Sequence, residues 1–215
     1  MALQHWKLER DADGIAWATL DVAGSSTNTL GSAVIAELAG LLDELDRQPP
    51  KGLVIRSGKA AGFIAGADIE EFTRIDSPAA ARALVERGWS LFNRLAAVAY
   101  PTLALVRGHC MGGGFELALA CDRSYHLALP DDEAAAPKIT VTAQNFGAYP
   151  MVTGESRLAR RFYNEAPAMD AVRAVQGQAL DADAAFALGL VTSNPDDIDW
   201  ADETRIAIEE RVAMS

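Results

Sequence analysis

Cysteine and basic residues are scarce in this 215-residue sequence, and both shortages limit what the protein can do. The two cysteines, Cys110 and Cys121, stand eleven positions apart without a CxxC pair or a histidine at ligand spacing, which argues against a disulfide framework and a zinc site. We expect both to be reduced and buried, and we expect no metal. The 19 lysines and arginines are outnumbered by 30 acidic residues, giving a net charge of -11. This excess disfavours nucleic acid and anionic membranes as partners.

Long apolar runs are also missing. No stretch approaches the ~18 to 20 apolar residues of a membrane span, and residues 1–14 contain no apolar core of a secretory signal. We therefore expect a cytoplasmic protein. Half of the composition is hydrophobic, which is enough for one sizeable core. There is no repeat and no convincing linker, so a single globular domain is the default.

The chain alternates strand-like and helix-like segments, which indicates an α/β fold with its ligand site at the carboxyl ends of the strands. A hairpin is expected over residues 6–22, because DADG supplies a turn between two short strands. Further strands are expected at residues 52–58, 102–108, 124–129 and 138–142, with a polar loop at 130–137 and a turn-rich loop at 145–154. Helices are expected at residues 32–47, 77–100, 113–120, 156–163, 170–176, 181–188 and 199–213.

Two strand-to-helix turns contain small residues, FIAGADIEEF at 63–72 and CMGGGFE at 110–116. GGG at 112–114 is not a GxGxxG motif, because Leu117 stands where the third glycine should be. RSGKAAG at 56–62 is not a P-loop, because Lys59 is followed by alanine and the upstream glycine spacing is wrong. Each of the two turns can direct backbone N–H groups at one point. Two such donors are what a thioester oxygen needs when it becomes an enolate. Glycine lets the substrate approach the backbone closely.

Glu116 stands at the start of an apolar helix, just after the three glycines. A carboxylate in this place could act as a general acid or base on the same bound group. The alternative is a partly solvated glutamate that the helix dipole favours. Asp68 is better explained as a cap of the helix beginning at Ile69, and Glu70 and Glu71 as surface charges of its first turn.

SGKAAGFIAGADIEEF together with VRGHCMGGGFELALACD resembles the crotonase, or enoyl-CoA hydratase/isomerase, superfamily. Residues 1–122 resemble the hydratase part of the fatty-acid-oxidation complex α subunit. The resemblance implies a (ββα)n spiral and an oxyanion hole formed by the N–H groups of Ala67 and Gly113, with Glu116 as one of two catalytic carboxylates. It also implies an acyl-CoA ligand held along residues 65–69 (Ala65, Gly66, Ala67, Asp68 and Ile69), no separate cofactor, and trimers or hexamers.

The second half departs from that pattern. When ITVTAQNFGAYPMVTGESRL is set against the hydratase loop, Ala143 stands where the second catalytic glutamate belongs, and alanine cannot transfer a proton. Glu133, Gln144 and Glu155 are the polar residues nearby in sequence. Residues 121–211 resemble the second crotonase-like half of the benzoyl-CoA-pathway ring-opening lyase. We expect a core over 1–190 and a shortened C-terminal helical segment over 191–215.

Three functions follow from these patterns. The first is a hydratase or isomerase, weakened by the missing carboxylate. The others are a ring-opening lyase acting on an oxygenated benzoyl-CoA and a non-catalytic CoA-binding or assembly module.

Other residues carry weaker signals. Lys59, with help from Arg56, could meet a CoA phosphate or could simply be solvated. His109 is better explained as a structural histidine than as a site residue. The helical spacing of Trp89 and Phe92 indicates core positions.

Overall fold

A computed structural model describes residues 3–59, 62–127 and 138–194, together with 202, 205–207, 209 and 210. The expected polar loop at 130–137, including Glu133, lies outside these residues. Of the expected helix at 199–213, the described residues are helical. No helix in the described part of the chain combines the length and the apolar composition needed to cross a bilayer.

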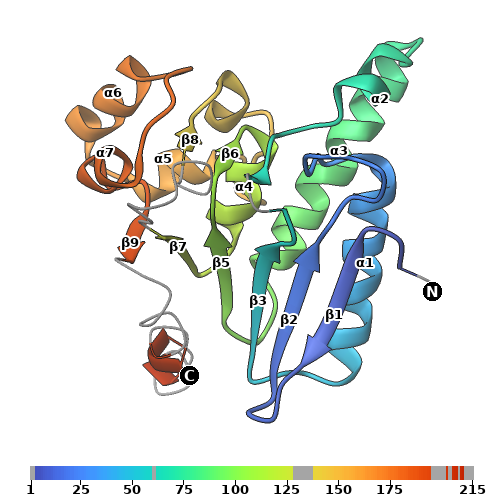
Figure 1. Ribbon diagram of the computed structural model, residues 1–215. Coiled ribbons are helices and arrows are strands. Elements are labelled where there is room, and N and C mark those ends of the chain that lie inside the picture. The colour runs from blue at the N-terminus through green and yellow to red at the C-terminus, as the bar shows by residue number, and fades with distance from the viewer. Residues whose placement is uncertain are drawn as a thin grey trace.

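The main sheet has six strands in the order β1-β2-β3-β5-β7-β9 (Figure 1). Its strands are β1 (Trp6–Arg10), β2 (Ile15–Leu20), β3 (Gly52–Ser57), β5 (Thr102–Val106), β7 (Arg123–Leu127) and β9 (Thr192–Asn194). β1 and β2 form the expected antiparallel hairpin, and all later neighbours are parallel. β9 lies within the region expected to be a separate helical segment, yet it extends the main sheet. The division at residue 190 as a domain boundary stays a prediction.

A second, three-stranded parallel sheet contains β4 (Gly62–Ile64), β6 (His109–Met111) and β8 (Lys138–Thr140). Each of β4 and β6 follows a main-sheet strand after only a few residues, so the small sheet lies beyond the carboxyl ends of β3 and β5 (Figure 1). Successive strand pairs thus add one strand to each sheet, followed by helices. This is the (ββα)n spiral that the sequence resemblance implies.

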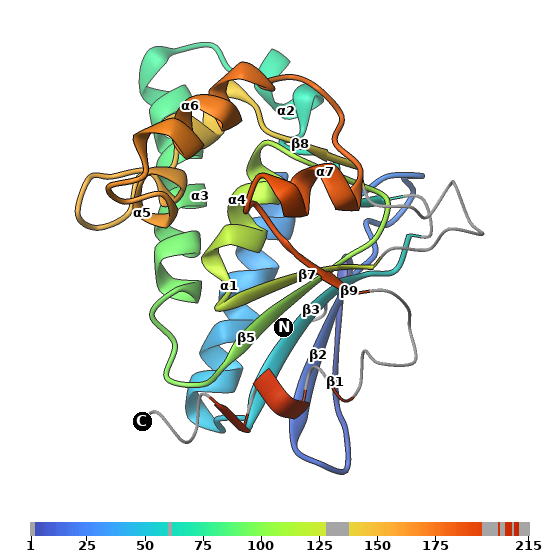
Figure 2. The ribbon, with the colours of Figure 1, turned by 90° about the vertical axis from the view of Figure 1, so that its left-hand side faces the viewer.

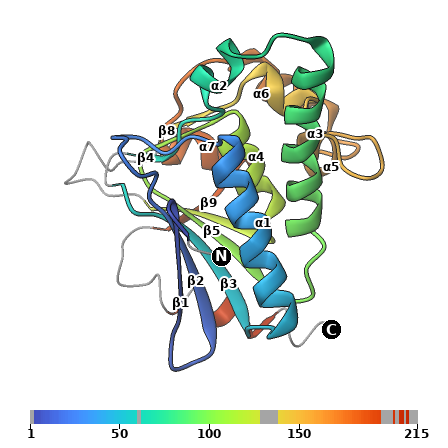
Figure 3. The ribbon, with the colours of Figure 1, turned by 90° about the vertical axis from the view of Figure 1, so that its right-hand side faces the viewer.

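The helices named in the described part are α1 (Ser32–Arg47), α2 (Ile69–Thr73), α3 (Pro78–Leu95), α4 (Gly113–Ala120), α5 (Arg157–Arg161), α6 (Ala166–Ala174) and α7 (Ala182–Ala187), with a 3-10 turn η1 (Ala143–Phe146). Of these, α1, α4 and α7 contact strands of the main sheet. α1 and α3 lie side by side (Figure 3), and α4 packs against both sheets. Figure 2 shows α5, α6 and α7 grouped near the small sheet, away from β1 and β2.

Local sequence signals explain most helix starts. Ser77 caps α3 with Pro78 in its first turn, Asp68 caps α2, and Asp181 caps α7, each through its side chain. Two expectations were wrong. α3 ends at Leu95 and not near Tyr100, and α6 begins at Ala166, four residues before the expected start.

Phe92 is fully buried and Trp89 packs against the core, as expected. The core lies between the helices and the main sheet and contains most of the buried side chains. Cys110 and Cys121 are both free and buried, as predicted. Burial raises the pKa of each thiol, which keeps them unreactive.

Candidate active site

The turn at residues 65–68 is held by the segment just before α1. The Ala65 N–H donates to the Asn28 carbonyl (2.9 Å), the Leu30 N–H donates to the Gly66 carbonyl (2.8 Å), and the Asp68 N–H donates to the Leu30 carbonyl (3.4 Å). The backbone of Leu30 therefore forms hydrogen bonds with Gly66 and Asp68, the residues on either side of Ala67. In such a parallel bridge the N–H of Ala67 points away from Leu30. Among the described residues it donates no hydrogen bond.

Asn28 fixes this segment in turn. Its side chain is 1% exposed and its amide nitrogen donates to the carbonyls of Leu20 (3.0 Å) and Phe63 (3.1 Å). Its amide oxygen accepts from the Val22 N–H (3.0 Å). One buried side chain thereby ties the end of β2 to β4. Asn28 was not predicted from the sequence, because nothing in the neighbouring residues indicates that its side chain is buried.

The second turn leads from β6 into α4. Gly112 has φ +51°, a conformation that favours glycine. A Cβ on Gly114 would lie 2.5 Å from the Ile64 carbonyl oxygen, so α4 packs directly on β4. Gly113 begins α4, where backbone N–H groups lack helical partners, and its N–H donates no hydrogen bond within the described ranges. The three glycines thus let the backbone turn and let α4 approach β4.

Both turns border one pocket of about 360 Å³. The first turn contributes Ala65, Gly66 and Ala67, with Ile69 and Phe72 beyond it, and the second contributes Met111 and Gly112. The pairing of β4 with β6 brings the turns together, because Ile64 lies opposite Cys110. Ile69 is 77% exposed, so this rim is open to a ligand. Two turns that are far apart in sequence therefore border the same pocket. That their N–H groups form an oxyanion hole stays a prediction.

Thr142, Ala143 and Gln144 form the opposite side of this pocket. Ala143 therefore borders the pocket, and its replacement of a second catalytic carboxylate stays a prediction. Of the two described candidates for its replacement, Gln144 lies at the pocket and Glu155 is exposed elsewhere. An amide can donate a hydrogen bond but does not exchange protons as a carboxylic acid does.

Glu116 is 1% exposed and lies behind the second turn. Its carboxylate accepts from the Asn145 amide nitrogen (2.9 Å) and pairs with an Arg157 guanidinium nitrogen (3.3 Å). Burial raises the pKa of Glu116, against the opposing effects of Asn145 and Arg157. The solvated alternative for this residue is therefore wrong. Its catalytic role stays a prediction.

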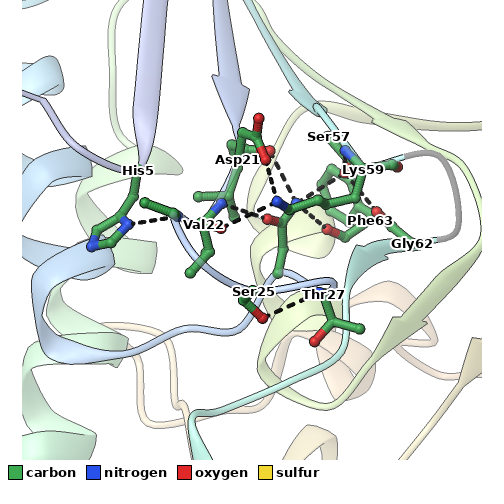
Figure 4. Close-up of polar contacts among 12 residues, drawn as sticks. His5, Asp21, Val22, Ser25, Thr27, Ser57, Lys59, Gly62 and Phe63 are labelled. Carbon is green, nitrogen blue, oxygen red and sulfur yellow. Dashed lines mark hydrogen bonds and ion pairs between the residues drawn. The ribbon is translucent and has the colours of Figure 1, made fainter.

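Three further expectations changed. Lys59 forms an ion pair with Asp21 and donates to the Val22 carbonyl (3.1 Å), so its ammonium is held by the two residues that follow β2 (Figure 4). Glu71 is not a free surface charge, since its carboxylate accepts from the backbone N–H and the hydroxyl of Ser32. His109 is exposed on β6 and is not a buried structural histidine.

No cluster of three or more His, Cys, Asp or Glu side chains that could hold a metal occurs within the described ranges.

Comparison with known proteins places this geometry in a family. Over 187 residues the chain is 37% identical to the fatty acid oxidation complex subunit alpha of Aliivibrio fischeri, a match covering 86% of this chain and 26% of that protein. It is 51% identical over 109 residues to the benzoyl-CoA-dihydrodiol lyase of Aromatoleum evansii, a match covering 50% of this chain and 19% of that protein. The chain thus spans about a quarter of the length of its fatty acid oxidation relatives or less.

Solved structures share the fold. The enoyl-CoA hydratase of Thermoplasma volcanium superposes with a TM-score of 0.76 at 25% identity, covering 95% of this chain and 77% of that one. The enoyl-CoA hydratase of Mycobacterium smegmatis superposes with a TM-score of 0.76 at 23% sequence identity, covering 99% of this chain and 77% of that one. Residues 11–212 match the sequence profile of enoyl-CoA hydratase/isomerase. Because this match takes in nearly the whole chain, the protein belongs to the enoyl-CoA hydratase/isomerase family.

Proposed function

We propose that this protein binds an acyl-CoA thioester and stabilises its enolate. The observation that carries this proposal is the meeting of two backbone turns at one pocket, with the N–H groups of Ala67 and Gly113 unpaired within the described part. Preorganised donors of this kind stabilise negative charge that develops only during the reaction. Acyl-CoA is the ligand class because the family relatives named for their substrates are CoA enzymes.

In this proposal the thioester carbonyl oxygen accepts from the N–H groups of Ala67 and Gly113. Glu116 takes a proton from water or from the substrate. Its buried carboxylate favours proton uptake, because burial raises its pKa, while Arg157 and Asn145 hold its orientation. Ala65, Gly66 and Ile69 line the entry and bind the thioester arm. Lys59 can reach a CoA phosphate only by leaving Asp21.

Hydration of crotonyl-CoA tests this function. Replacing Glu116 by Gln is expected to lower the rate by ~10²- to 10⁴-fold, because the amide cannot act as a general base. Glu70→Gln serves as the matched control, since the Glu70 side chain is 84% exposed on the outer surface of α2. Equal rates for the wild type and Glu116→Gln would remove Glu116 from the mechanism. Binding of acetyl-CoA in a calorimeter without turnover of any thioester would favour a non-catalytic module.

A ring-opening lyase is the second candidate. It is favoured by the 51% identity to benzoyl-CoA-dihydrodiol lyase over half of this chain. Incubation of the protein with an oxygenated benzoyl-CoA, followed by analysis for ring-cleaved product, distinguishes the lyase from the hydratase. Ring-cleaved product without hydration of crotonyl-CoA would favour the lyase.

A further inference from the structure

Ala143 leaves the proposed reaction short of one proton-transferring group, and Tyr149 lies close enough to the second turn to supply it. The residue is 7% exposed, and a Cβ on Gly113 would lie 3.7 Å from the Tyr149 hydroxyl oxygen. The hydroxyl thus lies next to the first residue of α4, whose N–H is proposed to bind the thioester oxygen. The residue comes from the loop that follows η1, far from both turns in sequence.

The Tyr149 hydroxyl has no hydrogen-bond partner among the described residues, although buried tyrosine hydroxyls usually find one. In the described ranges, the fully enclosed side-chain atoms without a partner are the Tyr100 hydroxyl and the His126 Nδ1. The Tyr149 hydroxyl is not one of them, so it keeps some solvent-accessible area. A polar group that is held in place, unpaired and partly open can form a hydrogen bond to a ligand without breaking one to the protein.

Packing fixes the Tyr149 ring. The ring makes an edge-to-face contact with the Phe92 ring, with ring centroids 5.3 Å apart, and a Cβ on Gly88 would lie 3.1 Å from its Cε1 atom. Glycine at position 88 of α3 therefore leaves the room that the ring occupies. With the ring held by α3, the hydroxyl is directed at the start of α4.

One guanidinium nitrogen of Arg157 joins Tyr149 to the proposed acid-base group. It donates to the Tyr149 carbonyl oxygen (3.0 Å) and to the Glu116 carboxylate (3.3 Å). Arg157 also donates to the Asn93 amide oxygen (2.8 Å), while the Asn93 amide nitrogen donates to the Pro150 carbonyl (3.1 Å). These bonds tie the backbone of residues 149–150 to α3 and to the Glu116 carboxylate.

We infer that the Tyr149 hydroxyl is the proton donor to the α-carbon of the bound acyl group, in place of the carboxylate that Ala143 lacks. This inference rests on the proposed function. In hydration, the Glu116 carboxylate takes a proton from water as the water oxygen bonds to the β-carbon. The carbon–carbon π bond breaks and its electrons move to the thioester as an enolate. The α-carbon then takes the phenolic proton, and the proton on Glu116 returns to the phenolate, so that one water has been added.

The electrostatics of the pair are consistent with this order. Burial, and then the charge of Glu116, raises the pKa of Tyr149, so the phenol holds its proton while Glu116 is ionised. When Glu116 has taken the proton from water, its charge no longer opposes the phenolate. Proton release by Tyr149 is thereby favoured after the first step and not before it.

Tyr149→Phe tests the inference, with Tyr163→Phe as the matched control because Tyr163 is 61% exposed on the surface. The readouts are crotonyl-CoA affinity by calorimetry, kcat for hydration, and exchange of the α-hydrogen of butyryl-CoA with D₂O. We expect Tyr149→Phe to bind within about twofold of the wild type, to lose ~10²- to 10⁴-fold in kcat, and to lose exchange by a similar factor. Tyr163→Phe should match the wild type.

Three results would overturn the inference, and they can be told apart. If the wild type binds and hydrates crotonyl-CoA and Tyr149→Phe keeps its kcat and exchange rate, Tyr149 is not the donor and the proposed function stands. If the wild type neither binds nor converts any acyl-CoA, the proposed function and this inference fall together. A merely structural role of Tyr149 would lower affinity and stability along with kcat, and that pattern also contradicts the inference.

Discussion

The Glu116 carboxylate is ionisable although the residue is only 1% exposed, and burying its charge costs several kcal/mol in desolvation free energy. Arg157 and Asn145 offset it by pairing with the two carboxylate oxygens. Arg157 is itself buried, and burial lowers its pKa while Glu116 opposes that shift. The two groups therefore depend on each other, and removing one leaves the other unpaired.

Arg157→Met should accordingly reduce the free energy of unfolding by about 3–5 kcal/mol, because it leaves the Glu116 carboxylate buried without its cation. The double variant Arg157→Met with Glu116→Gln should recover part of this loss, since no buried charge remains. Urea unfolding of the wild type, both single variants and the double variant measures the coupling. Additive losses in the double variant would show that the pair has no energetic interaction.

His126 should make stability depend on pH. It is fully buried, its Nε2 lies 2.9 Å from the Ser124 hydroxyl oxygen, and burial, with a smaller contribution from the charge of Arg161, lowers its pKa from 6.5 to about 3. Between these values the unfolded chain binds a proton that the folded chain does not, so stability falls as pH decreases from 6.5 towards 3. From pH 7 to pH 5 this amounts to about 2 kcal/mol.

The comparison of wild type with His126→Gln isolates this effect. The variant should lose about 2 kcal/mol less than the wild type between pH 7 and pH 5 in urea unfolding, because glutamine does not titrate. Parallel pH profiles of the two proteins would contradict the assignment.

At the scale of elements, α1 and the first turn stabilise each other. Gly31, at the N-cap of α1, offers no side chain, and the Glu71 carboxylate of α2 accepts from the Ser32 N–H instead. Capping by an acceptor from another helix satisfies one unpaired donor and places negative charge at the helix N-terminus. It also links α1 to the segment that begins directly after Ala67 and Asp68.

Glu71→Ala should therefore cost about 0.5–2 kcal/mol in the free energy of unfolding, the usual range for loss of a cap. Glu70→Ala is the control, because Glu70 is exposed and pairs only weakly with Arg74 at 3.4 Å. Thermal or urea unfolding of both variants gives the comparison. Equal stabilities would mean that Glu71 does not cap α1.

Helices and strands that are marked by nearby turn residues, capping residues or hydrophobic periodicity were predictable from the sequence. Those that depend on contacts with distant residues were not. The hairpin, α1 and the start of α3 follow from turn residues, periodicity and capping within a few positions. β4 and β6 were not recognised as strands, because three residues are too few to show a period of two. α6 began earlier than expected, although Pro167 near its start was a readable signal.

The same distinction holds for the site. The two turns were readable, because glycine patterns with a family likeness are local in sequence. Asn28, Tyr149 and the role of Arg157 were not, since each contacts, besides nearby residues, at least one residue 29 or more positions away. Glu71 was misassigned for that reason too, as its partner lies 39 positions earlier.

At the scale of the whole molecule, the spiral explains why the site is where it is. Each repeat of the spiral adds one strand to the main sheet and then one short strand to the small sheet. The small sheet therefore lies next to the carboxyl ends of β3 and β5. The two glycine-containing turns leave neighbouring strands of that small sheet. Their convergence is thus a consequence of the topology, while the groups that act on the ligand come from the helices and loops packed around it.

The most direct test of the central claim is the carbonyl stretching frequency of butyryl-CoA labelled with ¹³C at the thioester carbon, measured by isotope-edited infrared spectroscopy free and bound to the protein. If the N–H groups of Ala67 and Gly113 both donate to that oxygen, the carbonyl is polarised and its frequency falls on binding. A bound thioester that keeps its solution frequency would contradict the account.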